Sequence, residues 1–412
     1  MKKARITALL TSAVILLTGC DYGQFESYVL PTGNTSVSDE RNEESDLLGV
    51  KEKPSSIIDM SSQELVSSIR IGWNLGNTLD ACVTDRDGAA DGIPEGAAEI
   101  DETLWGNPYA TRELFKALTD DGFNAVRIPI TWCDHVDENG KISSVWMNRV
   151  QQVVDYAYSC GMYVIIGMYH DGGTDEEYGA WLGNAVRDKE GTLERYRRLW
   201  EQIAAQFKNY NERLIFESMN EVAFEGQSDN AAYRMLNSFN QEFVDTVRAS
   251  GGNNSMRHLL IAGYMTDIAK TCDERFIMPN DPAKKCIVSV HYYTPWEFCR
   301  TDLQSEWGTR SEEREMENLV AALKETFTDH GVPVIIGEFA ARGSDEASRI
   351  FFCEKLVKLC RDSGIACFLW DGGELVDRET YEWRSEELLN ALIRASYDDY
   401  TPVKKPEESG EE

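Results

Sequence analysis

Two glutamates of this 412-residue chain stand at the ends of short apolar runs, where a carboxyl group could do chemistry. Glu221 follows Asn220 at the end of one run, and Glu338 ends another. A protonated and an ionised carboxyl group, roughly 5–5.5 Å apart, can donate a proton to a leaving oxygen and attack the anomeric carbon, which is retaining glycoside hydrolysis. The fold would have to bring these two run ends together.

Other apolar runs also end in polar or aromatic residues that could assist such a pair. The positive charge of Arg127 could keep a nucleophilic carboxylate ionised. Asn220 could hydrogen-bond the 2-hydroxyl of a sugar, a contact that strengthens in the transition state. His291 or Tyr293 could donate hydrogen bonds to the nucleophile, and Trp370 could lie under the sugar ring. The further candidates for contact with the substrate are Asn77 and His170.

Eight short apolar runs are bounded by turn residues, as expected for parallel strands that are buried on both faces. They are Ile69–Leu75, Ala125–Ile130, Met162–Met168, Arg213–Phe216, His258–Ala262, Cys286–Val290, Val332–Ile336 and Ile365–Trp370. Helical periodicity fills most of the intervals: Thr111–Asp120, Ser144–Cys160, Thr192–Lys208, Ala231–Ala249, Ser311–Asp329 and Asp345–Asp362. This alternation predicts a (β/α)8 barrel, whose active site lies at the C-terminal ends of the strands.

Four of the expected helices end in a glycine directly before the next run, as is typical of a left-handed helix cap. These glycines are Gly122, Gly161, Gly331 and Gly364. The structural alternative is a doubly wound open sheet, which predicts a glycine-rich phosphate loop after the first strand. Residues 72–76, Gly-Trp-Asn-Leu-Gly, match that loop poorly. No clear helix is expected directly after the first strand or between the fifth and the sixth.

Residues 1–20 are predicted to be an export signal. Basic residues precede an apolar run, Ile6–Leu17, that is too short to span a membrane comfortably as a mature helix. The last four residues, Leu-Thr-Gly-Cys, resemble a bacterial lipobox, which would make Cys20 the lipidated first residue of the mature protein. We expect an exported protein whose only membrane contact is a lipid anchor on Cys20, with secretion into the surroundings as the alternative.

Three further segments are expected after the signal. Residues 21–55 are rich in Ser, Asn, Asp and Glu and are predicted to be a flexible tether. Residues 56–400 are predicted to form a single catalytic domain, because no long linker rich in Pro, Gly or Ser interrupts them. Residues 401–412 are charged and polar and are predicted to be a disordered tail.

The formal net charge of −30 excludes some partners. A surface this acidic repels phosphate backbones and anionic polysaccharides such as pectin. We therefore expect that the protein does not bind nucleic acid and that its substrate is a neutral polymer. The five histidines show no H-E-x-x-H spacing and the ten cysteines no C-x-x-C pair. We therefore expect mostly free buried thiols, no metal and no other cofactor, and we expect a monomer.

Six segments of the chain resemble glycoside hydrolase family 5 of clan A. They are residues 72–80 (GWNLGNTLD), 122–132 (GFNAVRIPITW), 216–221 (FESMNE), 290–296 (VHYYTPW), 336–339 (IGEF) and 369–372 (LWDG). Two of the segments alone would be weak signals, but all six in order are specific. The resemblance extends over about residues 60–395.

The resemblance implies a (β/α)8 barrel and a double-displacement mechanism, with Glu221 as the acid/base beside Asn220 and Glu338 as the nucleophile. It implies an active-site shell that contains Arg127, His291, Tyr293 and Trp370. The segment 290–296 is most similar to the subfamily that acts on cellulose, mixed-linkage glucan and xyloglucan. We therefore expect a retaining endo-β-1,4-glucanase, a cellulase that acts on a neutral β-glucan.

Two positions depart from the family's pattern. Relatives commonly end the third strand in two consecutive histidines, whereas this chain has Tyr169-His170. Relatives often follow the Trp-Asp of the eighth strand with Asn-Gly, whereas this chain has Gly372-Gly373. Neither change touches the catalytic pair, but Tyr169 bears on the contact beside the cleaved bond and so on the choice of substrate.

Two alternatives stay open on the sequence. The same fold could serve a xyloglucanase, a mixed-linkage glucanase or a β-mannanase. A surface glycan-binding lipoprotein that keeps the barrel without catalysis is the alternative from another class, and Tyr169 is the one feature that favours it. The presence of both Glu221 and Glu338 argues against that alternative, because a binding protein needs neither.

Overall fold

The structure, a computed structural model, describes residues 56–83, 101–173, 178–301 and 303–397. The expected export signal, tether and tail lie outside the described residues. Within the described part, no helix combines the length and the apolar composition needed to cross a membrane. The nine cysteines in these ranges are free thiols and six of them are buried, as the sequence predicts.

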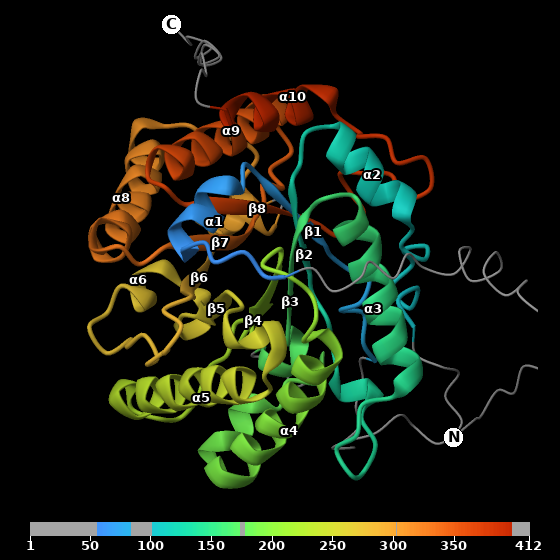
Figure 1. Cartoon of the computed structure of the whole chain (residues 1–412). Coiled ribbons are helices and arrows are strands. Elements are labelled where there is room, and N and C mark those ends of the chain that lie inside the picture. Colours follow the sequence, from blue (N-terminus) through green and yellow to red (C-terminus); the bar gives the residue numbers. More distant parts are fainter. Residues whose placement is uncertain (1–55, 84–100, 174–177, 302, 398–412) are drawn as a thin grey trace, which may run out of the picture. The chain divides into compact units, whose positions relative to one another are not determined.

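Eight parallel strands form a closed barrel, which confirms the predicted fold and excludes the open sheet (Figure 1). Each strand pairs with the next along the chain, and the eighth returns to the first, so the barrel leaves no unpaired edge. The strands are β1 (Gly72–Leu75), β2 (Ala125–Ile128), β3 (Tyr163–Gly167), β4 (Leu214–Glu217), β5 (Leu259–Ala262), β6 (Cys286–Tyr292), β7 (Val334–Phe339) and β8 (Ala366–Asp371).

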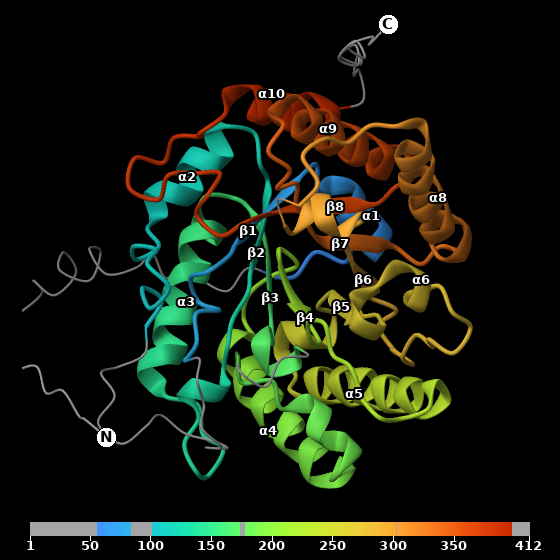
Figure 2. The ribbon, with the colours of Figure 1, turned by 180° about the vertical axis from the view of Figure 1, so that it is seen from behind.

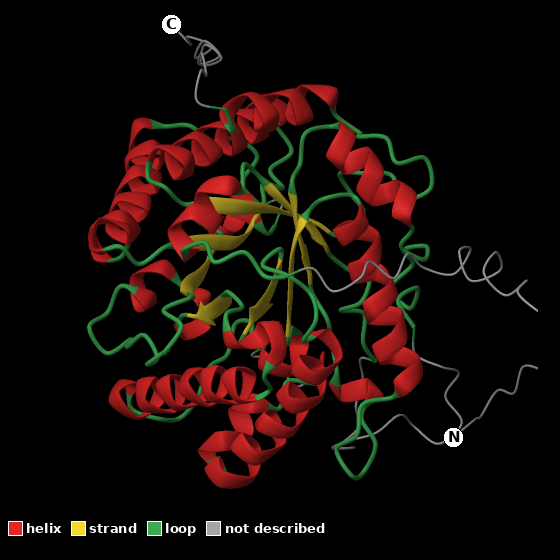
Figure 3. Cartoon of the chain, in the orientation of Figure 1, coloured by secondary structure: helices red, strands yellow, loops and turns green. Residues whose placement is uncertain are grey.

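Helices surround the barrel on the outside (Figures 2 and 3). The long ones are α2 (Arg112–Asp120), α3 (Ser144–Ser159), α4 (Lys189–Phe207), α5 (Asp229–Ala249), α8 (Arg310–Thr326), α9 (Glu346–Asp362) and α10 (Glu386–Ala395). The helix α4 begins earlier than expected because the Asp188 side chain caps it at Gly191 N. The span expected to run to Asp329 ends at Thr326, and a separate 3-10 turn follows at Thr328–His330.

A short helix that the sequence analysis did not predict closes the N-terminal end of the barrel. This helix, α1 (Ser62–Ser68), starts with a capping box between Ser61 and Glu64. Its buried residues Leu65 and Val66 pack against apolar side chains that the strands point inward. Between β5 and β6 the chain forms a 3-10 turn (Tyr264–Thr266) and the four-residue helix α6 (Ile268–Thr271), which agrees with the lack of a long helical pattern there.

The inward face of the strands changes from apolar to polar toward the C-terminal end. In β2 the inward residue Ala125 is followed two positions later by Arg127, and in β4 Ile215 is followed by Glu217. Successive inward side chains are two residues apart in a strand, so each pair belongs to two stacked layers. The polar layer is the floor of the barrel mouth.

Candidate active site

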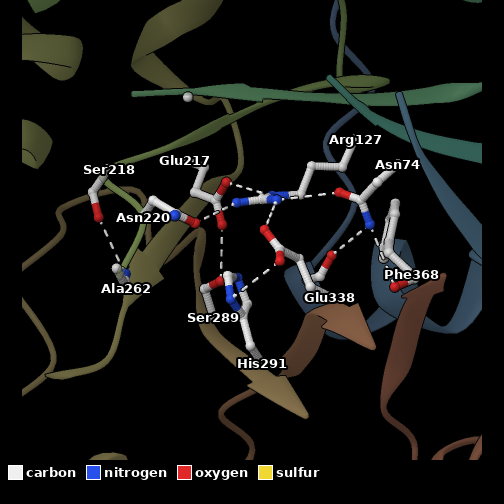
Figure 4. A network of polar contacts seen from close by, with 12 residues as sticks. Asn74, Arg127, Glu217, Ser218, Asn220, Ala262, Ser289, His291, Glu338 and Phe368 are labelled. Carbon is white, nitrogen blue, oxygen red and sulfur yellow. Dashed lines mark hydrogen bonds and ion pairs between the residues drawn. The ribbon is translucent and has the colours of Figure 1, made fainter. Parts of the chain in front are cut away.

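Arg127 lies at the centre of this polar layer, and its guanidinium contacts four side chains (Figure 4). Nε donates to Glu217 Oε2 at 2.7 Å, and Nη1 donates to Glu338 Oε1 at 2.6 Å and to Asn74 Oδ1 at 3.1 Å. Nη2 donates to Asn220 Oδ1 at 3.0 Å. Because the guanidinium is a rigid planar fork, these bonds fix the positions of two carboxylates and two amides relative to one another.

Glu338 reaches the mouth because the pairing of β7 is irregular. The register shifts between Ile336 and Phe339, and His291 of β6 pairs with Glu338 rather than with Gly337. Such irregularities re-aim a side chain, and they are common beside active sites. The Glu338 carboxylate therefore points into the barrel beside Arg127 (Figure 4).

Contacts on both oxygens hold the Glu338 carboxylate in its ionised form. Tyr293 Oη donates to Oε2 at 2.7 Å, while Arg127 holds Oε1. Burial by itself would raise the pKa of Glu338, but electrostatic interaction with His291 and Arg127 and the hydrogen bond from Tyr293 outweigh it and lower this pKa to about 2. Burial and the charge of Glu338 raise the pKa of Tyr293 well above its usual value, so the phenol stays a donor.

Glu221 follows β4 and is the more accessible of the two glutamates, with 38% of its side chain exposed against 2% for Glu338. Its Oε1 lies 2.7 Å from His291 Nδ1, which donates in the tautomer that carries its proton there. His291 Nδ1 is 3.7 Å from Glu338 Oε2. One oxygen of each glutamate and one nitrogen of His291 lie within 4.8 Å of one another, so the two carboxyl groups form a close pair.

The same three side chains have donor atoms that could hold a metal ion. In this geometry their facing atoms already contact one another, since His291 Nδ1 bonds Glu221. Glu338 is further neutralised by Arg127 at 2.6 Å. The arrangement thus places a charge-balanced carboxylate beside an accessible one without any added cation.

Aromatic rings line the mouth next to the carboxylates. The Tyr169 ring stacks parallel to that of Trp370, with centroids 5.6 Å apart and 13° between the planes, and it lies 5.4 Å from the Arg127 guanidinium carbon. The ring of His170 meets Tyr169 edge-on at 4.7 Å. A Cβ at Gly76 would come within 2.7 Å of the Trp370 ring, so only glycine fits beneath that tryptophan.

Buried aspartates organise the loops around the mouth. Asp371 accepts hydrogen bonds from the backbone amides of Gly373, Leu375 and Val376 and so shapes the loop after β8. Asp171 accepts from Trp132 N at 2.7 Å, which ties the ends of β2 and β3 together. Each of these carboxylates also accepts a hydrogen bond from an indole N–H, of Trp73 for Asp371 and of Trp181 for Asp171, so both position the loops and their side chains.

The structure brings most of the predicted site residues into one set of contacts. Hydrogen bonds connect Arg127, Asn220, Glu338 and Tyr293, and another connects Glu221 with His291. Trp370 and His170 join through the ring of Tyr169. Asn77 stands apart: it has a left-handed backbone with φ 55°, and its amide lies against Gly372 after β8.

Three residues that position Arg127 are not among those predicted from the sequence. Glu217 and Asn74 bond its guanidinium, and Ser289 Oγ donates to Glu217 Oε1 at 2.9 Å. Each is a polar residue in a strand that is otherwise buried and apolar, which is a weak signal in the sequence because it does not tell an inward from an outward side chain. At Gly167 of β3 a Cβ would lie 2.8 Å from the Glu217 carbonyl oxygen, so this glycine makes room for Glu217.

Comparisons with known proteins agree with this geometry. The family model described as cellulase (glycosyl hydrolase family 5) matches residues 89–374. Endoglucanase A of Paenibacillus barcinonensis is 34% identical over 381 residues, which cover 81% of this chain and 90% of that protein. The cellulase/esterase CelE of Acetivibrio thermocellus is 34% identical over 82% of this chain, and the chain spans 41% of that longer protein.

A solved structure is similar in fold as well as in sequence. The GH5 xyloglucanase of Bacteroides ovatus, in complex with a XXXG heptasaccharide, superposes with a TM-score of 0.75 at 32% sequence identity. The alignment covers 84% of this chain and 79% of that one. The similarity therefore extends over nearly all of the barrel.

Proposed function

The chain belongs to glycosyl hydrolase family 5, and on that premise we propose that its mouth performs retaining endo-β-1,4-glucan hydrolysis with Glu338 as nucleophile and Glu221 as acid/base. The proposal rests on the different surroundings of the two glutamates. Oxygens of the two carboxyl groups lie within 4.8 Å, close to the spacing of retaining enzymes. Glu338 is buried against a guanidinium, whereas Glu221 is accessible to a leaving group.

In the first step, the ionised Glu338 attacks the anomeric carbon while Glu221 donates its proton to the departing glycosidic oxygen. Arg127 and Tyr293 orient the attacking carboxylate through its two oxygens. The bond to the leaving sugar breaks as the bond to Glu338 forms, and a covalent glycosyl-enzyme remains.

In the second step, Glu221 has lost its proton and takes one from an incoming water. The water oxygen attacks the anomeric carbon, and the bond to Glu338 breaks with return of the electron pair to its carboxylate. Two inversions at one carbon restore the β configuration. Arg127 then stabilises the negative charge that returns to Glu338.

The variants Glu221→Gln and Glu338→Gln test the pair. Each is expected to lower kcat on a soluble β-1,4-glucan by at least about 10³-fold, because each removes a reacting group. Thermal melting of each variant checks that it still folds. Near-normal activity in either folded variant would refute the assignment.

Azide separates the two roles. With an activated aryl cellobioside, azide should restore turnover in Glu221→Ala and give the β-glycosyl azide, because it attacks the glycosyl-enzyme without a general base. In Glu338→Ala it should take the place of the nucleophile and give the α-glycosyl azide. The opposite pattern of anomers would exchange the two assignments, and proton NMR of the products distinguishes them.

Xyloglucan is the second candidate substrate, and the similarity to the Bacteroides ovatus xyloglucanase favours it. A panel of soluble cellulose derivatives, mixed-linkage glucan, xyloglucan and β-mannan, with analysis of the released oligosaccharides, ranks the polymers by kcat/KM. A cleavage preference for β-mannan would contradict the glucanase proposal. Binding of any glycan without release of reducing sugar would support a non-catalytic glycan-binding protein instead.

We also propose that the protein is exported and anchored by a lipid on Cys20. The basic start, the apolar run Ile6–Leu17 and the four residues that end at Cys20 support this proposal. In a bacterial host, labelled palmitate should enter the wild-type chain but not Cys20→Ser, and the variant should lose its membrane association. Equal labelling of both chains would contradict a lipid on Cys20.

A further inference from the structure

A pocket of about 850 Å³ lies between the loops that follow β6, β7 and β8. Four arginines line it, against two glutamates; the charged lining residues are Arg300, Arg342, Arg349, Arg384, Glu346 and Glu374. The chain as a whole carries a formal net charge of −30, so an excess of positive charge in one cavity is unusual for this protein. The size is typical of a pocket for a small molecule or a sugar.

The arginines of this arginine pocket differ in their partners. Arg342 forms an ion pair with Glu374, and Arg384 forms one with Asp377 at 3.3 Å. Among the described residues, the guanidinium groups of Arg300 and Arg349 have no hydrogen bond and no ion pair, although both side chains are half-buried. Arg300 lies over the rings of Tyr293 and Trp296, which stabilise its charge in part. The half-buried guanidinium of Arg349 has no such contact among the described residues, so an anion in the pocket would offset its desolvation cost.

Arg300 connects the pocket with the catalytic cleft. Its guanidinium carbon lies 5.0 Å from the ring centroid of Tyr293 and 5.7 Å from that of Trp296. Tyr293 in turn donates to the nucleophilic carboxylate of Glu338. Only Tyr293 would therefore separate an anion held by Arg300 from Glu338. A branch on the bound polymer could reach that position.

We propose that the arginine pocket binds the carboxylate of a uronic acid branch carried by the β-glucan substrate. The guanidinium fork of Arg349 or Arg300 pairs with a planar carboxylate through two parallel hydrogen bonds. Trp383, Leu375 and Leu388 supply apolar lining for a sugar ring. This inference rests on the proposed function, because it places the branch by the position of the glucan chain in the cleft.

The strongly negative surface sets a limit on the acidic substrate. A polyanion such as pectin is repelled along its whole length, whereas an isolated carboxylate is attracted once it lies in the pocket, since the field of nearby charges dominates within a Debye length. The pocket thus fits a mainly neutral glucan with sparse acidic branches.

A matched pair of polymers tests the inference with the full-length enzyme. One is a galactosylated xyloglucan, and the other is the same xyloglucan with the galactose C6 oxidised to a carboxylate. In the wild type the ratio of kcat/KM, oxidised over neutral, should exceed one at low salt, and 0.5 M NaCl should lower it. In Arg349→Gln this ratio should fall about tenfold, as expected for the loss of a charge-assisted hydrogen bond.

Arg234→Gln is the control for the loss of one positive charge. Arg234 is exposed on α5, which lies on the other side of the barrel from α9 and α10 (Figure 1). This variant should keep the wild-type ratio. A wild-type ratio below one, or an unchanged ratio in Arg349→Gln, would overturn the inference.

Direct binding keeps the pocket testable if the proposed function fails. Isothermal titration of the wild-type protein with glucuronate should give a measurable Kd that weakens about tenfold in Arg349→Gln, and glucose should not bind there. Failure to cleave either polymer would show that xyloglucan is not a substrate and would leave the titration to decide on the pocket. Binding of inorganic phosphate but not of glucuronate would overturn the assignment to a uronic acid.

Discussion

The two ends of the barrel use the same eight strands but present opposite chemistry to the interior. At the N-terminal end, the inward residues Ile165 and Ile215 pack against Leu65 of α1 in an apolar plug. Two residues further along β4, Glu217 bonds Arg127, and that arginine bonds Glu338. Two residues along a strand therefore separate an inner layer stabilised by apolar contacts from one stabilised by ion pairs and hydrogen bonds.

The two ends of the barrel respond differently to substitution. An apolar plug depends on the volume and the area buried, so residues of similar volume can replace one another approximately. In the polar layer each group satisfies another that has no access to water, so the loss of one member leaves a buried charge uncompensated. The mouth should therefore tolerate few substitutions, whereas the opposite end should tolerate other apolar residues of similar volume.

The largest effect is expected from Arg127→Met, which breaks the polar layer at its centre. It leaves the carboxylates of Glu217 and Glu338 buried without their shared cation, and removal of one partner from a buried ion pair costs about 3–5 kcal/mol. Urea unfolding measures this loss, and kcat should fall with it. Arg127→Lys keeps the positive charge but not the planar guanidinium, so its stability should lie between that of the wild type and that of Arg127→Met. Wild-type stability in Arg127→Met would mean that the layer does not depend on its cation.

Leu65→Ala breaks the other end, and its expected effect is confined to stability. A buried leucine truncated to alanine costs about 2–4 kcal/mol, whereas kcat measured well below the melting temperature should stay at the wild-type value. Ile58→Ala is the matched control, because Ile58 is 63% exposed and should change stability by less than about 0.5 kcal/mol. A fall in kcat for folded Leu65→Ala would show that the plug and the mouth are coupled.

Acid should lower the contribution of the polar layer to the free energy of unfolding and leave that of the apolar plug unchanged. The pKa of Glu338 is about 2 in the folded chain, below the ordinary value of about 4.3 in an unfolded one. Its contribution to stability is therefore complete above pH 4.3 and is lost as the pH falls toward 2. Between pH 5 and pH 3, wild type and Leu65→Ala should lose more unfolding free energy than Glu338→Gln. Equal losses in all three chains would contradict the low pKa.

The contrast also explains what the sequence could predict. Apolar runs determine where strands lie, so the sequence predicts all eight strands and six of the seven long helices, with ends shifted by a few residues, but it does not predict α10. Residues that follow those runs were found as site candidates by their position at strand ends, and their roles came from the family resemblance. Gly331 and Gly364 have the left-handed backbone expected of helix caps, with φ 76° and 69°.

What the sequence did not give are the contacts that depend on three-dimensional register. Glu217 is the last residue of β4 and Ser289 lies inside β6, and alternation alone does not tell whether either side chain points inward. The irregular pairing that turns Glu338 inward follows from the packing of β6 against β7. Tryptophan is equally ambiguous in sequence: Trp307 is buried against Phe352, whereas Trp296 is 56% exposed.

The smallest effect is expected at Tyr169, which lies at the edge of the hydrogen-bonded polar layer. The Tyr169 ring stacks on Trp370 and lies over Arg127, while no hydrogen bond joins its hydroxyl to another described residue. Burial and the charge of Glu338 raise its pKa well above the usual value, so the hydroxyl stays a neutral donor for a sugar. Tyr169→Phe should thus keep the melting temperature but lower kcat/KM by about tenfold or less, the value of one hydrogen bond.

Tyr169→His is the sharper variant, since it restores the residue that relatives commonly carry there. The smaller ring gives up part of the stacking on Trp370, which should lower the melting temperature by a few degrees. It keeps a donor toward the sugar, so kcat/KM should change less than in Tyr169→Phe on at least one β-glucan, and the order of preferred polymers should shift. Wild-type kcat/KM in both variants on every polymer would show that this ring only packs, and that the substrate is selected elsewhere in the mouth.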